Sequence, residues 1–144
     1  MTALIVATHS TFCLGIKEGG EFVSGEHKNA FFIQLDNNGV ETFQKNLMEL
    51  IETVHKTYDS ILFLTDLKNA TPYNQISGIL FSGAYPNDRL LSGVNLAMYI
   101  EAALSSEILD DIDELAESAV FAGRASIAKL ENMEILESAD DDDL

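Results

Sequence analysis

The chain has 144 residues, 47% of them hydrophobic, which is enough apolar material for the core of one folded domain. Its 24 acidic and 8 basic residues give a formal net charge of -16, which disfavours binding to nucleic acid or to an anionic membrane because both are negatively charged. The single cysteine excludes an intramolecular disulfide. The sequence has neither a signal-peptide pattern nor an apolar run that could cross a bilayer, so we expect a cytoplasmic protein.

Short apolar runs that are typical of buried strands alternate with longer segments of helical periodicity. Strands are predicted at residues 4–7, 31–35, 61–64 and 90–94, and helices at residues 11–23, 40–54, 71–81, 96–104 and 112–128. Such alternation implies right-handed crossovers between parallel strands. The predicted fold is therefore α/β: a flavodoxin-like, doubly wound, mostly parallel four-stranded sheet with helices on both faces.

The C-terminal part of the chain gives weaker signals. Residues 133–136 could pair into the sheet as an added edge strand, whereas residues 137–144 end in a run of aspartates that we expect to be disordered. We therefore predict one domain over residues 1–136 and an acidic tail over residues 137–144. Near the middle of the chain, Thr71 and Pro72 resemble a helix N-cap followed by proline at the first helical position.

Two titratable residues follow neighbouring strands of the predicted sheet. His9 comes at the end of the first strand and Asp66 just after the third. In this topology the strand order reverses between those two strands, and ligands bind at the carboxyl edge where it reverses. Because adjacent strands lie roughly 5 Å apart, the two side chains are expected to meet.

A neutral imidazole beside a carboxylate is suited to accepting a phosphoryl group. One ring nitrogen carries a lone pair that can attack phosphorus, and the carboxylate fixes the N–H tautomer and balances the positive charge that develops. Backbone N–H groups at helix N-termini can hold phosphoryl oxygens. The helices opened by Ser10-Thr11 and by Thr71-Pro72 are the candidates, and Thr71 could add a hydroxyl donor.

Several segments in this order resemble one bacterial protein family. They are Leu4–His9, Leu62–Leu67, Thr71–Asn74, Ser92–Met98 and Gly123–Arg124. Together they make residues 1–130 similar to the mannose-family IIA component of the phosphoenolpyruvate-dependent sugar phosphotransferase system.

This resemblance implies a phosphohistidine carrier. His9 would take the phosphoryl group from the phosphocarrier protein HPr and pass it to a IIB component during sugar uptake. Asp66 would orient the imidazole, and Ser10 and Thr71 would lie at the phosphoryl group. The resemblance further implies a homodimer in which a C-terminal strand, here residues 133–136, pairs with the partner, and at most peripheral association with membrane permease components. It implies no cofactor and no metal.

The sequence departs from the family pattern in two places. Ser10 stands where the family usually has glycine, and Lys68-Asn69-Ala70 replaces a loop that usually carries two glycines. Because glycine allows a positive φ, a different pocket shape and slower transfer are expected; asparagine tolerates that conformation better than alanine.

Other functions are compatible with parts of this pattern. The phosphotransfer subunit of a dihydroxyacetone kinase shares the fold, and a non-catalytic domain of the same fold is a further alternative. A flavin domain would need a glycine-containing phosphate loop after the first strand, and a receiver domain would need acidic residues there for Mg²⁺. His27 and His55 lie in polar stretches and are expected to be solvated.

Overall fold

The computed structural model describes residues 1–131 and has a single parallel sheet at its centre. Its strands are β1 (Thr2–His9), β2 (Ala30–Leu35), β3 (Ser60–Thr65) and β4 (Arg89–Ser92). They lie in the order β2-β1-β3-β4, and every neighbouring pair is parallel. The strand order reverses between β1 and β3, which confirms the predicted flavodoxin-like, doubly wound topology.

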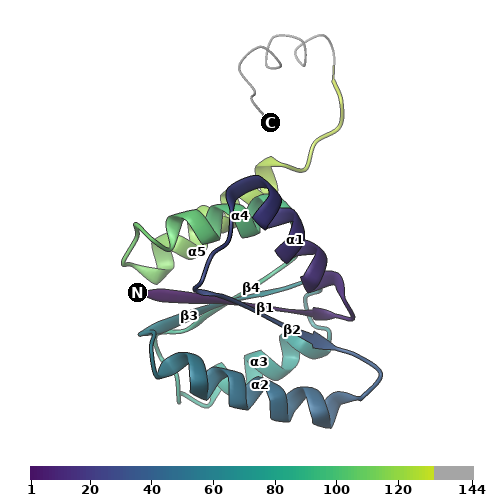
Figure 1. The fold of residues 1–144 in the computed structure, drawn as a ribbon, viewed down its shortest axis with the longest axis vertical. Coiled ribbons are helices and arrows are strands. Elements are labelled where there is room, and N and C mark those ends of the chain that lie inside the picture. The colour runs from purple at the N-terminus through teal and green to yellow at the C-terminus, as the bar shows by residue number, and fades with distance from the viewer. Residues whose placement is uncertain (132–144) are drawn as a thin grey trace.

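Five helices in the described residues cover the two faces of this sheet. They are α1 (Phe12–Ser24), α2 (Val40–His55), α3 (Thr71–Phe81), α4 (Leu96–Ser105) and α5 (Ile112–Ala125). Figure 1 shows the sheet nearly edge-on, with α1, α4 and α5 on one side and α2 and α3 on the other. Within residues 1–131 no helix combines the length and apolarity that a membrane span requires.

Alternation along the two central strands produces two separate cores. Leu4 and Val6 of β1 face the layer of α1, α4 and α5, whereas Ala3, Ile5 and Ala7 face α2 and α3. Successive side chains of a strand point to opposite faces, so a strand covered on both sides must be apolar throughout. This is why the apolar runs were recognisable in the sequence.

The helix α2 confirms the amphipathic pattern predicted for residues 40–54. Its buried side chains are Phe43, Leu47, Ile51 and Val54, all of them facing the sheet. Burying each such side chain is worth about 1.5–3 kcal/mol. Gly39, with a φ of 92°, precedes the helix after a turn in which Asp36 accepts the Asn38 N–H.

One predicted helix end and one predicted N-cap were wrong. The last helix ends at Ala125 rather than at residue 128. The N-cap of α3 is Ala70, so Thr71 is the first helical residue and its side chain makes no capping hydrogen bond. Local residue preference favoured threonine as the cap, but the path of the chain after β3 places the cap one residue earlier, at Ala70. The predicted strand at residues 133–136 and the acidic tail at 137–144 lie outside the described residues.

The prediction that His27 and His55 are solvated was also wrong. The His27 side chain is 4% exposed, and its Nε2 lies 2.9 Å from the Ser24 hydroxyl. His55 stacks on Tyr85 with ring centroids 4.8 Å apart, and its Nε2 lies 2.8 Å from Asp88 Oδ2. Both histidines have polar neighbours in the sequence, yet segments distant along the chain cover them.

Asp88 connects three elements at the amino end of the sheet. Its side chain is fully buried, and its second oxygen accepts the backbone N–H of Ile61 at 2.8 Å. Burial raises the pKa of this carboxyl above its ordinary value, although the hydrogen bonds from His55 and Ile61 oppose that shift. The carboxyl thus joins the end of α2, the start of β3 and the loop before β4.

Replacing Asp88 with alanine is expected to destabilise the protein by about 2–4 kcal/mol, because the buried Ile61 N–H and the His55 ring lose their acceptor together. Urea unfolding at neutral pH measures the change. Asp110→Ala, which removes an exposed carboxyl, is the control and should change stability little. A loss no larger than that of the control would contradict the linking role of Asp88.

Candidate functional site

His9 and Asp66 meet at the carboxyl edge of the sheet, as predicted. One oxygen of Asp66, Oδ2, accepts the backbone N–H of His9 at 3.0 Å and lies 2.9 Å from His9 Nδ1. Its other oxygen, Oδ1, accepts the N–H of Leu67 at 3.0 Å. The Asp66 side chain is 11% exposed and that of His9 is 41% exposed. The carboxylate is therefore held inside the site, and the ring reaches the surface.

The hydrogen bonds define which ring nitrogen of His9 is available. Burial alone would raise the pKa of Asp66, but the hydrogen bonds from the His9 backbone and ring, together with the attraction between the two groups, hold this pKa below its ordinary value. At neutral pH the carboxylate is consequently ionised and only accepts hydrogen bonds. In the neutral form of the His9 ring, Nδ1 therefore carries the proton and Nε2 carries the lone pair.

The turn after β1 fixes where the His9 ring lies. Ser10 adopts a φ of 50°, in the left-handed region that glycine favours, and its N–H donates to the carbonyl of Leu35 at 2.7 Å. A non-glycine residue in this region costs about 1–2 kcal/mol. The chain therefore makes at Ser10 the turn for which the family pattern has glycine, and the bond to β2 holds it.

The loop after β3 also has a non-glycine residue with a positive φ. Asn69 has a φ of 64°, while Ala70 is extended with a φ of -93°. This confirms the expectation that asparagine rather than alanine would take the left-handed conformation. The Asn74 side chain donates to the Asn69 carbonyl at 3.0 Å and ties the loop to the first turn of α3.

Of the four residues predicted for the site, His9 and Asp66 are in direct contact, and Ser10 adjoins them with its side chain exposed. Thr71 begins α3, half-buried. No hydrogen bond joins its side chain to His9 or Asp66 in the described part of the chain. The helices α1 and α3 begin shortly after His9 and Asp66, so the positive ends of two helix dipoles flank the pair.

Thr8 belongs to the site and was not predicted. Its side chain is fully buried; its hydroxyl accepts the N–H of Cys13 at 2.8 Å and donates to the carbonyl of His9 at 3.4 Å. Thr11, the N-cap residue of α1, makes no side-chain cap. Thr8 therefore caps α1 from the preceding strand. A hydroxyl inside an otherwise apolar strand could have indicated this, because buried hydroxyls need partners.

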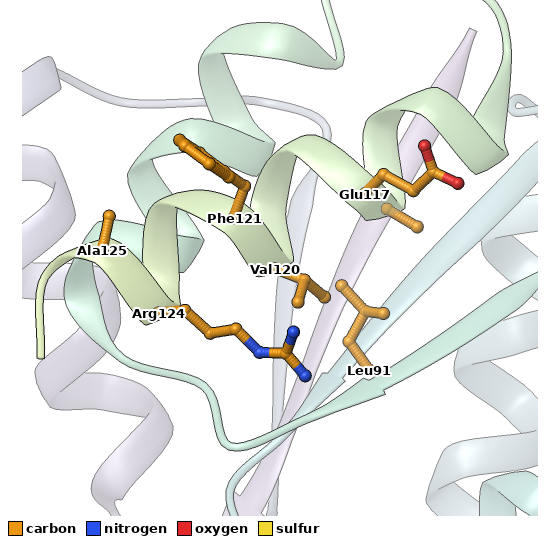
Figure 2. Close-up of a pocket in the computed structure, with 7 residues that line it drawn as sticks. Leu91, Glu117, Val120, Phe121, Arg124 and Ala125 are labelled. Atoms are coloured by element: carbon orange, nitrogen blue, oxygen red, sulfur yellow. The ribbon is translucent and has the colours of Figure 1, made fainter.

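A cavity of about 670 Å³ lies away from this pair, between α5 and β4. Figure 2 shows the side chains that line it, which come from Leu91 of β4 and from one side of α5. They are mostly apolar and include one acid, Glu117, and one base, Arg124. We place the candidate site at His9 because two titratable side chains meet there. The volume of the other cavity does not by itself indicate a reaction.

The fold and the site define an α/β protein of the doubly wound class, with a carboxylate-bound, partly exposed histidine at the switch point of its sheet. Residues 3–120 match the family described as "PTS system fructose IIA component". The chain belongs to this family of IIA components of the sugar phosphotransferase system.

Individual relatives agree with the family match. The chain is 25% identical over 130 residues to the mannose-specific EIIAB component of Escherichia coli K12; the match covers 89% of this chain but 39% of that longer protein. It also resembles two solved structures. The phosphotransferase system component EIIA from Streptococcus agalactiae has a TM-score of 0.79 and 25% identity, covering 90% of this chain and 97% of that one. The mannose/sorbose-specific IIA subunit from Enterococcus faecalis has a TM-score of 0.78 and 27% identity, covering 90% and 95%.

Replacing Thr8 with valine keeps the shape of the side chain but removes the acceptor for the buried Cys13 N–H. We expect a loss of about 1–2 kcal/mol in the free energy of unfolding, measured with urea. Thr8→Ser should retain most of the lost stability. Thr57→Val, at an exposed threonine, is the control. Equal losses in the serine and valine variants would contradict the capping role of the hydroxyl.

Proposed function

We propose that this protein is a cytoplasmic phosphohistidine carrier that accepts a phosphoryl group from HPr on His9 and passes it to a IIB component during sugar uptake. The observation that carries the proposal is the pairing of His9 Nδ1 with the Asp66 carboxylate, which leaves Nε2 with a lone pair on a ring that is partly exposed. A protein that donates a phosphoryl group can therefore reach the His9 ring first, and a protein that accepts the group can reach it afterwards.

In the proposed reaction, the Nε2 lone pair of His9 attacks the phosphorus of the donor's phosphohistidine. A new N–P bond forms at His9 while the N–P bond of the donor breaks, and the donor's ring keeps the electron pair of the broken bond. The proton on His9 Nδ1 stays in place, so the phosphorylated ring carries a positive charge. The Asp66 carboxylate, 2.9 Å away, balances this charge, and the group leaves by the reverse of the same step.

The surroundings of His9 suit a group that arrives with negative charge. The N-termini of α1 and α3 present backbone N–H groups and a positive dipole end near the pair. Both oxygens of Asp66 are already engaged by His9 and Leu67, which favours a supporting role for this carboxylate over a role as the phosphoryl acceptor itself. This observation argues against the receiver-domain alternative.

Incubation with phosphoenolpyruvate, enzyme I and HPr is expected to label the wild type with an acid-labile, base-stable phosphoryl group and to leave His9→Ala unlabelled. In Asp66→Asn, labelling should be slower by about 10- to 100-fold, because the amide cannot balance the charge of the phosphorylated ring.

His55→Ala serves as the matched control, since it removes a histidine at the opposite end of the sheet. Its labelling should equal that of the wild type under conditions where both are folded. A folded wild type that takes no label, or a label that survives in His9→Ala, would overturn the proposed function.

We further propose that the protein is a homodimer formed along the free edge of β4. In the described residues β4 is the last strand of the sheet, so its outer edge leaves backbone groups available for pairing. The cavity of Figure 2 lies beside β4. Phe121, which is 76% exposed, is one of the residues that line this cavity. An exposed aromatic side chain beside an unpaired strand edge is typical of a surface that another subunit covers.

Phe121→Ser is therefore expected to weaken the dimer, measured as a shift toward monomer in sedimentation velocity at a fixed concentration. Phe81→Ser removes an even more exposed phenylalanine, 89% exposed, from the end of α3 on the other face of the sheet, and should leave the dimer unchanged. A monomeric wild type, or equal effects of both substitutions, would refute this interface.

A further inference from the structure

A polar cavity of about 340 Å³ lies at the carboxyl end of β4. Its lining includes Lys68 from the loop after β3, Ser92 and Asn95 from the segment that joins β4 to α4, and Arg124 from the last turn of α5. Two of these segments, Ser92–Met98 and Gly123–Arg124, belong to the motifs singled out in the sequence. The chemistry at His9 uses neither of them.

Hydrogen bonds and close packing fix the wall between α4 and α5. The Asn95 side chain accepts the N–H of Met98 at 2.9 Å and donates to the carbonyl of Gly123 at 2.9 Å. A Cβ atom at Gly123 would lie 3.1 Å from Met98 Cβ, so glycine allows the two helices to approach. Gly123 directly precedes Arg124, so these contacts also fix the position of the Arg124 backbone beside the cavity.

The charge of the lining is opposite to that of the molecule. None of the acidic residues within residues 1–131 lines this cavity. The adjoining cavity of Figure 2 shares Arg124 with it but also includes Glu117. Within residues 1–131, Lys68 and Arg124 form no ion pair. In Figure 2 the Arg124 guanidinium extends from α5 toward the end of β4. Two cations that have no ion-pair partner in the described part of the chain therefore line one polar cavity from different segments.

We propose that this cavity binds the phosphate monoester of a small sugar or polyol. A guanidinium matches the geometry of a phosphate with two parallel hydrogen bonds, and an ammonium adds a point charge. Ser92 and Tyr73 also line the cavity, and hydroxyl side chains are suited to the hydroxyl groups of the remaining part of the ligand. The choice of a sugar or polyol rests on the proposed role in sugar uptake, but the recognition of phosphate does not.

Binding is tested by calorimetric titration of the full chain at low ionic strength with fructose 6-phosphate, inorganic phosphate and fructose. We expect saturable binding of fructose 6-phosphate, weaker binding of inorganic phosphate and none of fructose. Arg124→Gln and Lys68→Gln should each weaken binding of the ester by about tenfold or more. Lys45→Gln, which removes the same charge as Lys68→Gln at an exposed site on α2, is the control and should bind as the wild type does.

The His9→Ala variant separates this proposal from the proposed function. It is expected to bind fructose 6-phosphate as the wild type does, although it cannot be phosphorylated. Absence of saturable ester binding, or binding that Arg124→Gln and Lys68→Gln leave unchanged, would overturn the site while leaving the role of His9 intact. Equal binding of the ester and inorganic phosphate would overturn the assignment to a sugar or polyol phosphate.

Discussion

The parallel pairing of β1 with β3 is the constraint on which the rest of the structure depends. It places Ala7 opposite Thr65, so that both strands end at the same edge of the sheet and residues separated by 57 positions become neighbours. The same pairing puts two strands without polar faces at the centre of the molecule and requires helices on both sides. The position of His9 against Asp66 and the layered core thus have one physical origin.

A carboxylate plays a similar structural part at each end of this sheet. Asp66 accepts one backbone N–H and contacts the ring of His9; Asp88 accepts one backbone N–H and contacts the ring of His55. Their environments differ. Burial prevails at Asp88 and raises its pKa, whereas hydrogen bonds prevail at Asp66 and lower its pKa. One pair therefore presents an ionised carboxylate to an exposed ring, and the other links buried elements.

At the carboxyl edge of the sheet, two non-glycine residues adopt the left-handed backbone conformation where the family pattern usually has glycine. Ser10 and Asn69 adopt the positive φ values that glycine would take freely. Each is held by a neighbouring segment, Ser10 through the Leu35 carbonyl and Asn69 through the Asn74 side chain. Strain at these turns is thus offset by hydrogen bonds, and the turns keep the direction that brings His9 to Asp66.

Most of the fold was predictable because buried strands and amphipathic helices have periodic patterns of their own. The runs around Leu4 and Leu62 and the stripe of α2 reflect local burial, and the strand order was the one common to flavodoxin-like sheets. The same reasoning brought His9 and Asp66 together, since it needs only the strand ends and the order of the strands. Ser10 and the loop after Asp66 were also recognisable as departures, because their residue types differ from the pattern.

What the sequence alone determined is the alternation of elements, the two-sided core and the pairing of one histidine with one carboxylate. Tertiary structure decided the surroundings of isolated polar groups: Thr8 as the cap of α1, the burial of His27, the bond between His55 and Asp88, and the placement of Lys68 and Arg124 in the lining of one cavity. The physical reason is that periodicity reports which face of an element is buried, whereas a polar group's partner depends on how segments distant in the sequence pack together.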